Sequence, residues 1–364
     1  MEFVKLGDVV DIKTGKLDVN AENPNGKYPF FTCSKKHTYI DDYAFDGEYI
    51  LVAGNGDLNV KYYLGKFNAY QRTYVIKPSN TIDGKYLYYF LETYLKILRN
   101  QSIGGVIKYI KLGNLTEALI PLPSLEVQKA IAARLDKADQ IRQLNQQIIN
   151  HYDELIQALF IDMFGDPVKN EKGWEKSIIG EVCSKIQIGP FGSQLHQSDY
   201  VDNGLPLINP VNIKKDKIDL LNSVKITQEK YDELPNYHLR IHDIILARRG
   251  DLSKIGYIRN ENNFCGTGSL FIRLKSNLNS FFIFKLLNHT STINYLYENA
   301  QGVTMPNLNK KIVYNIPIFL PPIELQNQFA ERVEKIEAQK ELAVQALQQS
   351  EDLFNSLLQQ AFKK

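Results

Sequence analysis

The sequence predicts a mixed α+β protein in which two long antiparallel coiled-coil helices hold two globular domains apart, with a pseudo-twofold internal duplication. Three observations lead to this prediction: a repeated motif, two long stretches without glycine or proline, and short strand-like runs outside those stretches. The chain has 364 residues, two to three times a common domain length, so more than one domain is expected.

The duplication is visible in a motif that occurs twice. Leu122–Gln128 reads Leu-Pro-Ser-Leu-Glu-Val-Gln, and Leu320–Gln326 reads Leu-Pro-Pro-Ile-Glu-Leu-Gln. The two copies then continue in register without a gap, and a weaker similarity between residues 6–9 and 179–182 opens each half. Self-similarity over such a long period indicates duplication of a whole half and not a solenoid of short repeats.

Each motif opens a stretch with the composition of a long helix. No glycine or proline occurs from Leu125 to Phe164 or from Ile323 to Lys364. Apolar residues recur there every three or four positions, a narrow stripe typical of a two-helix seam. The expected seam residues are Ile131, Leu135, Ala138, Ile141, Leu144, Ile148, Leu155 and Leu159, and Phe329, Val333, Ile336, Ala343, Leu347, Phe354 and Leu357. Two amphipathic helices on separate domains are the alternative, but forty residues make a rod of about 60 Å, which needs a partner along its length.

Domain boundaries follow from the repeat. We expect a first globular domain over 1–122, a first spacer helix over 123–166, a second globular domain over 167–320 and a second spacer helix over 321–364. Both globular segments read as mixed α/β, because short β-branched and aromatic runs alternate with Gly- and Asn-rich turns. Strands are expected near 48–52, 74–76, 244–246 and 270–272, and helices near 85–99 and 280–287.

Composition excludes several classes of protein. No run of about 18 apolar residues is present, so a membrane-spanning helix is not expected, and the first residues lack the layout of a signal peptide. Cys33, Cys183 and Cys265 lie far apart without a CxxC motif, which argues against a disulfide framework or a zinc site. A cytoplasmic location fits this cysteine usage. The formal net charge of +2 neither favours nor excludes a nucleic-acid partner.

Motifs for catalysis are missing. The sequence contains no GxxxxGK[ST] loop, no GxGxxG after a strand and no Asn-Pro-Pro-aromatic tetrapeptide of amino-methyltransferases. His238 and His242 have a spacing that could bind a metal on a helix, but they precede an apolar strand, so a structural or surface role is favoured. We therefore expect no catalytic residue, no metal site and no cofactor bound by this chain.

Loops suited to phosphates and bases occur in both halves. Arg and Lys bind phosphate oxygens and guanine edges, Asn and Gln suit adenine, and loop glycines let the backbone approach closely. The candidate DNA-binding residues of the first half are Ser34, Lys35, Lys36, Asn55, Asn59, Lys61, Tyr63 and Arg72. Those of the second half are Phe191, Ser193, Gln194, Arg248, Arg249, Ser253, Lys254, Ser269, Met305 and Asn307. Any one such loop could be a plain β-turn, and their recurrence in both halves supports a binding role.

The alternation of two variable segments with two matched helical segments resembles the DNA-specificity (S) subunit of Type I restriction-modification systems over essentially the whole chain. Residues 189–193, 247–251 and 302–307 resemble recurrent loops of the target-recognition domains in that family, and residues 49–61 with 71–72 resemble another subtype. The first half lacks the Gly-Pro-Phe-Gly-Ser phrase of 189–193. The two halves are therefore expected to read different sequences by partly different loops.

The resemblance implies a function. Each domain would read one half of a split, asymmetric target in double-stranded DNA, without catalysing a reaction. Two methyltransferase (M) subunits that use S-adenosylmethionine, and restriction (R) subunits that use ATP and Mg²⁺, would be its partners. Candidate methyltransferase-docking residues on the outward helix faces are Gln128, Arg134, Gln326 and Arg332. A non-catalytic helical scaffold, or a fragment of a single-chain restriction or methylation enzyme, is the alternative.

Overall fold

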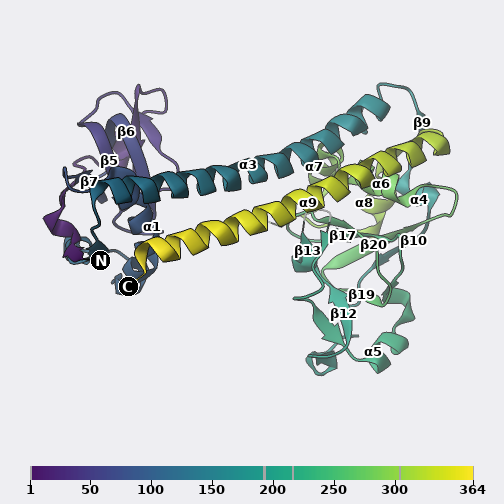
Figure 1. Ribbon diagram of the computed structural model, residues 1–364. Helices are drawn as coiled ribbons and strands as arrows, with labels where there is room; N and C mark the ends of the chain where they lie inside the picture. Colours follow the sequence, from purple (N-terminus) through teal and green to yellow (C-terminus); the bar gives the residue numbers. More distant parts are fainter. Residues whose placement is uncertain (1, 192–193, 215–216, 303–304, 364) are drawn as a thin grey trace. The chain divides into compact units, whose positions relative to one another are not determined.

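The computed structural model describes residues 2–191, 194–214, 217–302 and 305–363, and the chain forms two compact units. Unit 1 comprises residues 1–148 and 342–364, and unit 2 comprises residues 149–341. Two long helices, α3 (Leu125–Phe164) and α9 (Ile323–Phe362), each contribute one part to each unit (Figure 1). The predicted mixed α+β class with two long helices is confirmed.

The ends of α3 and α9 follow from proline and glycine. Pro123 and Pro322 stand just before the two helices, where a missing N–H costs nothing. Gly165, at φ +79°, ends α3 in the left-handed conformation that glycine adopts without strain. Both helices are 40 residues long, as the absence of internal glycine and proline predicted.

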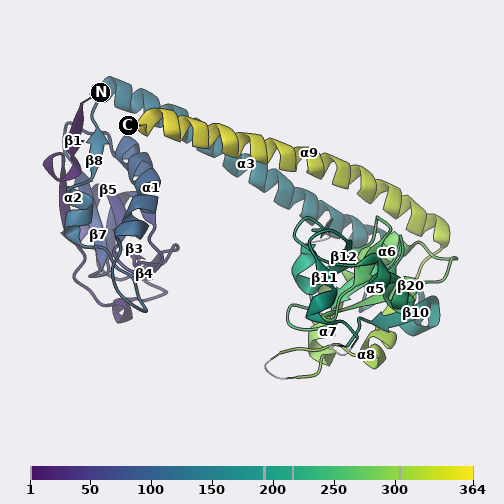
Figure 2. The ribbon, with the colours of Figure 1, turned by 90° about the horizontal axis from the view of Figure 1, so that it is seen from below.

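Within each unit the two helices are antiparallel, and Figures 1 and 2 show them side by side. In unit 1, the Arg142 guanidinium lies 4.7 Å from the centroid of the Phe354 ring, and Asn145, further along α3, donates to the carbonyl of Ala346, which comes earlier on α9. In unit 2, the rings of Phe160 and Phe164 lie 5.5 Å and 5.3 Å from the ring of Phe329. Residue numbers therefore rise along one helix as they fall along the other.

The expected seam of α3 was partly wrong. Ile141, Leu144, Ile148 and Leu155 are 48%, 56%, 43% and 48% exposed. Of the predicted residues Leu135 and Ala138 are buried, and Ala132, Ile149, Ile156 and Phe160 are buried without having been predicted. The apolar residues of α3 form two stripes, one buried and one exposed. Because residues of both stripes recur every three or four positions, the sequence analysis assigned them all to one seam. The second stripe stays about half exposed to solvent.

Unit 1 is built on a sheet with the strand order β2-β7-β5-β6-β3-β4, and α1 packs on one face of it. The strands of unit 1 are β1 (Phe3–Lys5), β2 (Val10–Thr14), β3 (Tyr28–Phe31), β4 (Thr38–Ile40), β5 (Phe45–Ala53), β6 (Val60–Ala69), β7 (Thr73–Pro78) and β8 (Leu119–Pro121). Its helices besides the long pair are α1 (Gly84–Gln101) and α2 (Leu112–Thr116). The short strands β1 and β8 pair with each other just before α3.

Unit 2 has one sheet of order β10-β20-β17-β18 and another of order β11-β15-β12-β19-β16. Its strands are β9 (Glu175–Ile178), β10 (Cys183–Ile188), β11 (Tyr200–Val201), β12 (Leu205–Ile208), β13 (Ile213–Lys214), β14 (Lys217–Ile218), β15 (Val224–Ile226), β16 (His238–Leu239), β17 (Ile244–Ala247), β18 (Ile255–Tyr257), β19 (Asn263–Cys265), β20 (Ser269–Leu274) and β21 (Pro317–Leu320). Its helices are α4 (Ile179–Val182), α5 (Gln228–Glu233), α6 (Ser280–Leu287), α7 (Thr290–Asn299) and α8 (Lys310–Tyr314).

The two units share one strand arrangement. The sequence repeat predicted the duplication but not this strand order. Strand β7 lies between β2 and β5 in unit 1, and β20 lies between β10 and β17 in unit 2. Each unit also contains one parallel pair, β3 with β6 within the unit 1 sheet and β12 with β19 in the second sheet of unit 2. The four strands and two short helices predicted in the globular segments all lie within observed elements of the same type.

Candidate nucleic-acid interface

In unit 2, the Arg-rich turn after β17 is hydrogen-bonded to a second loop from far along the chain. The N–H of Leu308 donates to the carbonyl of Arg248 at 2.8 Å, and the N–H of Gly250 donates to the carbonyl of Pro306 at 3.1 Å. Gln301 and Asn307 bond each other through both backbone groups. Gly250 has φ +77°, so the turn needs a residue without a side chain there.

Unit 1 contains the same construction from different residues. The N–H of Ile110 donates to the carbonyl of Gly54 at 2.9 Å, and the N–H of Gly56 donates to the carbonyl of Lys108 at 2.9 Å. Ile103 and Tyr109 bond each other through both backbone groups, and Gly56 has φ +70°. We call these segments the paired loops: 54–57 with 103–109 in unit 1, and 248–251 with the described residues 301–302 and 305–307 in unit 2.

The sequence analysis missed residues 103–109. Val106 is fully exposed and Ile107 is 62% exposed, so the loop presents apolar side chains to solvent. Its Ile-Gly-Gly-Val-Ile composition lacks the polar residues that a search for base-reading groups favours. The available signal was its position, because it precedes the Leu122 motif at the same distance as 301–307 precedes the Leu320 motif.

A second shared position is a glycine at the end of the first strand of each sheet. The N–H of Gly15 donates to the carbonyl of Thr73, and the N–H of Gly189 donates to the carbonyl of Ser269. A Cβ on either glycine would lie 1.9 Å from a backbone oxygen, that of Ala69 or of Gly266, so the backbones approach too closely for any other residue. Although unit 1 lacks the Gly-Pro-Phe-Gly-Ser phrase, it keeps this first glycine contact.

The basic side chains of the unit 2 loop differ in exposure, and the turn that carries them is held by hydrogen bonds. Asp251 accepts hydrogen bonds from the Ser253 hydroxyl at 2.5 Å and from the Tyr297 hydroxyl at 3.2 Å, and the Ser253 bond lowers the pKa of the Asp251 carboxyl. Arg249 is exposed, and Lys254 is half-buried beside it in sequence. Burial, and then the charge of Arg249, lowers the pKa of Arg248. The Arg248 Nε is buried and has no hydrogen-bond partner among the described residues.

Other predicted residues of unit 2 flank this turn. Phe191 and Met305 are 63% and 59% exposed, which leaves an aromatic ring and a thioether open to a ligand. The Gln194 amide oxygen accepts from the Phe191 N–H at 3.3 Å and from the Tyr237 hydroxyl at 2.8 Å, so Gln194 shapes the loop. Asn307 is half-buried in the paired loops. Ser193 lies outside the described residues.

In unit 1 the predicted polar residues form a connected network. Asn59 donates to the carbonyls of Cys33 at 2.8 Å and Asp57 at 2.9 Å, and its amide oxygen accepts from the Lys61 ammonium. Lys35 pairs with Asp57 at 3.4 Å. Burial lowers the pKa of Lys61. Asn59 therefore joins residues 33–35 to residues 57–61 and positions the lysines.

The remaining residues of unit 1 differ in exposure. Ser34, Lys36 and Arg72 are exposed, whereas Asn55 is half-buried where its backbone meets Tyr109. Arg72 and Tyr109 also line one surface hollow beside the paired loops. The ring of Tyr63 packs against Phe31 at 5.1 Å and Phe67 at 5.6 Å, so it belongs mainly to an aromatic cluster.

Three predicted positions are corrected by burial. Ser269 is fully buried, and its hydroxyl donates to the Ile208 carbonyl at 3.0 Å, so it cannot reach DNA. Gln128 and Gln326 are 0% and 2% exposed and do not lie on outward faces. A glutamine, being polar, was assigned to the surface, but here each amide is used inside the chain.

The two glutamines make equivalent hydrogen bonds at the start of the two long helices. The Gln128 amide oxygen accepts from the N–H of Asp83 at 2.8 Å, and its nitrogen donates to the Pro123 carbonyl at 2.8 Å. The Gln326 oxygen accepts from the N–H of Asn279 at 3.2 Å, and its nitrogen donates to the Pro321 carbonyl at 2.8 Å. Asp83 and Asn279 are the N-caps of α1 and α6. Each glutamine thus fastens the start of a long helix to a globular helix.

Arg134 and Arg332, the other two docking candidates, are exposed. Arg134 lines a hollow between α3 and α9 in unit 1, together with Leu135 and Leu357. Arg332 lies on α9 beside Met163, with 4.0 Å between its Nη1 and the sulfur. Both remain predictions for docking.

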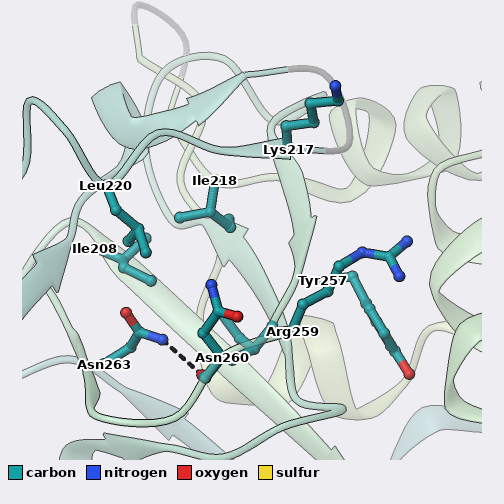
Figure 3. Close-up of a pocket in the computed structure, with 9 residues that line it drawn as sticks. Ile208, Lys217, Ile218, Leu220, Tyr257, Arg259, Asn260 and Asn263 are labelled. Carbon is teal, nitrogen blue, oxygen red and sulfur yellow. Dashed lines mark hydrogen bonds between the residues drawn. The ribbon is translucent and has the colours of Figure 1, made fainter. Parts of the chain in front are cut away.

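The hollow in Figure 3 has an apolar floor made by Ile208, Ile218 and Leu220. Its rim carries Arg259 and Asn260, and Lys217 and Tyr257 also line it, whereas no carboxylate, histidine or cysteine among the described residues does. Across the described ranges, no cluster of His, Cys, Asp or Glu is suited to a metal ion, and none of the helices is apolar enough over a sufficient length to cross a membrane. The His238 ring stacks on Tyr231 with centroids 3.6 Å apart.

Comparison with known proteins agrees with this arrangement. The family model for the Type I restriction modification DNA specificity domain matches residues 1–151 and again 171–351. The EcoDI specificity subunit of Escherichia coli is 27% identical, with 99% of this chain and 87% of that protein covered. The MjaVIII specificity subunit of Methanocaldococcus jannaschii is 26% identical, with 92% and 86% covered.

Solved structures show the same fold. The S subunit of a Type I restriction-modification system from M. genitalium has a TM-score of 0.64 at 18% identity, and the match covers 100% of this chain and 96% of that one. The relatives are specificity subunits, and the fold is that of S subunits and not of a methyltransferase, which confirms the prediction of a non-catalytic chain. Because a family model matches most of its length, this chain belongs to the Type I restriction modification DNA specificity family.

Proposed function

We propose that each unit reads one half of a split DNA target through its paired loops. The observation that carries this is the shared backbone of the loops, in which Asn55 meets Tyr109 and Arg249 meets Asn307. A common backbone with different side chains presents different hydrogen-bonding groups to the base edges. The two half-sites would therefore differ, and the whole target would be asymmetric.

The two units would use different chemistry. Unit 2 offers exposed Arg249 with half-buried Arg248, whose guanidinium groups suit guanine edges and phosphates. The Arg248 Nε has no partner within the described ranges and would gain one from DNA. Unit 1 offers Lys35, Lys61 and Arg72, together with the apolar tip at Val106, which suits the methyl group of thymine.

The long helices would set the number of base pairs left unread between the half-sites, because half-site spacing follows protein geometry. Both helices are continuous over 40 residues. Asn145 donates at 3.2 Å to the Ala346 carbonyl and to the Ser350 hydroxyl, in a seam that is otherwise mostly apolar. One polar contact of this kind fixes the register of a helix pair.

The exposed stripe of α3 would dock methyltransferase subunits. In unit 1 it comprises Val127, Ile141, Leu144 and Ile148, and Arg134 has the same seven-residue spacing. Spacing by seven is typical of a seam that packs on another helix. Two methyltransferase subunits, which carry S-adenosylmethionine, and restriction subunits, which use ATP and Mg²⁺, would assemble with this chain in the cytoplasm. Within the chain, target-recognition domains over 1–122 and 167–320 would alternate with spacer helices over 123–166 and 321–364.

The test removes one basic residue from each unit. In the complex with its methyltransferase subunits, Arg248→Ala and Lys61→Ala should each weaken binding to the target duplex and reduce the slope of log affinity against log salt. Lys96→Ala, an exposed lysine on α1, is the control. Methylome sequencing of cells carrying the system supplies the target. Unchanged affinity and salt dependence for both variants would contradict the proposal.

A further inference from the structure

A second group of basic side chains lies on a sheet face next to the paired loops. In unit 2, Lys185 on β10 is paired with Arg273 on β20, and in unit 1 the matching positions are Asp11 on β2 and Lys77 on β7. We call these two surfaces, β2 with β7 and β10 with β20, the strand-pair faces.

The strand-pair faces point away from the globular helices. Side chains alternate along a strand, and Ile76 on β7 packs in the same core as α1, so Lys77 lies on the opposite face. In unit 2, Ile272 packs in the same core as α6, so Arg273 lies on the opposite face. Part of each opposite face is covered, since Val75 and Phe271 are buried there in a second core. What stays open to a ligand are the exposed basic side chains beside that core, Lys13 and Lys77 in unit 1 and Arg240 and Lys310 in unit 2.

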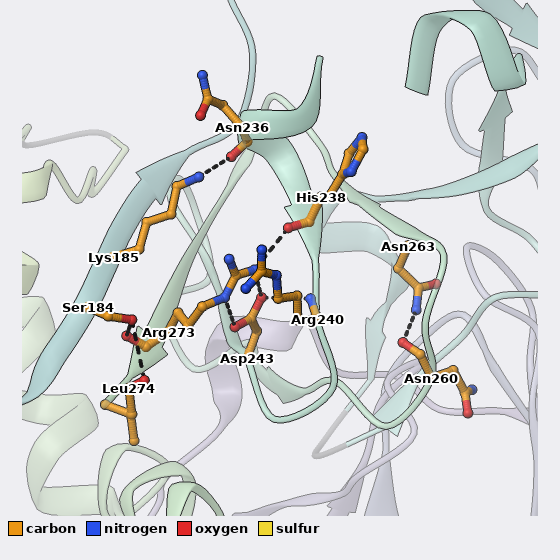
Figure 4. Close-up of polar contacts among 10 residues, drawn as sticks. All are labelled: Ser184, Lys185, Asn236, His238, Arg240, Asp243, Asn260, Asn263, Arg273 and Leu274. Atoms are coloured by element: carbon orange, nitrogen blue, oxygen red, sulfur yellow. Dashed lines mark hydrogen bonds and ion pairs between the residues drawn. The ribbon is translucent and has the colours of Figure 1, made fainter. Parts of the chain in front are cut away.

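Positive charge accumulates on the unit 2 face, as Figure 4 shows for Lys185, Arg240 and Arg273. The Asp243 carboxylate is bound by Arg273 through two hydrogen bonds of 2.8 Å and 2.7 Å. Within the part of the chain that the structure describes, Lys185 donates to a neutral carbonyl, that of Asn236, at 2.8 Å. Burial, then the charges of Arg273 and Arg240, lower the pKa of Lys185, and the Asp243 carboxylate opposes this effect.

The cluster continues toward the paired loops. Lys310 donates to the Gln187 side-chain oxygen at 3.2 Å, and Gln187 lies two residues before Gly189. Lys310 itself follows Asn307 by three residues. The basic face is thus continuous with the loops to which we assign base reading.

Unit 1 carries charge at the equivalent place with other residues. Lys13, Lys16 and Lys77 line one hollow on the β2–β7 face, with Phe45 and Tyr49 also in its lining. Asp11 pairs with Lys13 at 3.0 Å and offsets one of the three charges. The position is shared between the units, but the residue types are not: Gln187 corresponds to Lys13, and Arg273 to Lys77.

We propose that the strand-pair faces bind the phosphate backbone of DNA without reading its sequence. Phosphate contacts need positive charge at a given place and tolerate a change of residue type, whereas base contacts need a particular side chain. This inference rests on the proposed function of the paired loops. It assigns to the chain a source of affinity separate from those loops.

The test compares two double variants with a matched control in the complex with methyltransferase subunits. The variants are Lys16→Ala with Lys77→Ala, and Arg240→Ala with Lys310→Ala, and the control is Lys96→Ala with Lys335→Ala, two exposed lysines on α1 and α9. Binding is measured across salt concentrations on the target duplex and on a scrambled duplex of equal length.

Each variant should reduce the slope of log affinity against log salt by about 1.8, since each lost phosphate contact removes about 0.9. The loss should be equal on the two duplexes, and the control should keep the wild-type slope. An unchanged slope, or a loss confined to the target duplex, would overturn this inference while leaving the loops intact. If the wild-type complex itself does not discriminate the duplexes, the proposed function fails, and this inference with it.

Discussion

The hydrogen bonds of Gln326 offer a direct test of whether the repeated motif stabilises the fold or docks a partner subunit. Replacing Gln326 with alanine removes two hydrogen bonds, one from the Asn279 N–H and one to the Pro321 carbonyl. At a net value of about 1 kcal/mol for each bond, unit 2 should lose about 2 kcal/mol. The Asn279 N–H also loses its acceptor, at the position that caps α6.

Trp174 makes this loss measurable in unit 2 alone, because it is the only tryptophan of the chain. It is half-buried, and its indole N–H donates to the Phe164 carbonyl at 2.9 Å, so its fluorescence reports unfolding of unit 2. With a urea m-value of about 2 kcal/mol/M, the midpoint should fall by about 1 M.

Gln328→Ala is the matched control, since Gln328 is exposed on the same helix and the substitution is identical. Its midpoint should stay within the error of the wild-type value. If Gln326→Ala unfolds at the same urea concentration as Gln328→Ala but fails to assemble with methyltransferase subunits, the structural interpretation is wrong and docking at this position is restored.

The remaining predictions concern spacing, assembly and pH. Four residues inserted after Asn145 add about 6 Å to α3, which should change the number of unread base pairs by about two. Methylome sequencing measures that spacing, and circular dichroism checks that the variant is folded. An unaltered spacer would refute the role of the helices. Leu144→Gln should weaken capture of the methyltransferase subunit while leaving thermal stability within about 0.5 kcal/mol, because Leu144 is exposed; equal capture would refute docking at this stripe. Burial lowers the pKa of His289, and the charge of Asp166 opposes this effect. As the pH falls through about 6.5, the His289 imidazole is therefore protonated in the unfolded chain before it is protonated in the folded chain, and the folded state loses stability below that pH. His289→Asn keeps an acceptor for the Ser291 N–H and should flatten the melting temperature between pH 7.5 and 5; an unflattened profile would remove His289 as the cause.

The sequence predicted what local composition determines. The ends of α3 and α9 followed from prolines and from the first glycine after Phe164, and the strands near 48–52 and 270–272 followed from β-branched and aromatic runs. These elements depend mainly on neighbouring residues, so a linear pattern is enough to find them.

Features that depend on distant contacts were missed or misassigned. The loop at 103–109 became recognisable only when its backbone bonds to Gly54 and Gly56 were seen. The Ser269 hydroxyl was placed at DNA because its Gly-rich surroundings look like an open loop, yet the start of β20 buries it. A polar side chain in a motif can form hydrogen bonds inside the fold or with a partner molecule. Only the three-dimensional position of its hydrogen-bond donors and acceptors shows which of the two it does.

The exposed stripe of α3 also bears on how this protein is produced. Ile141, Leu144 and Ile148 leave three large aliphatic side chains in contact with water, a surface that drives self-association when nothing covers it. Under the docking proposal, a chain of this kind is best expressed from the same transcript as its covering subunit and in equal amounts. Purified in isolation, it should lose soluble yield as its concentration rises, and a surplus of the covering subunit should restore that yield.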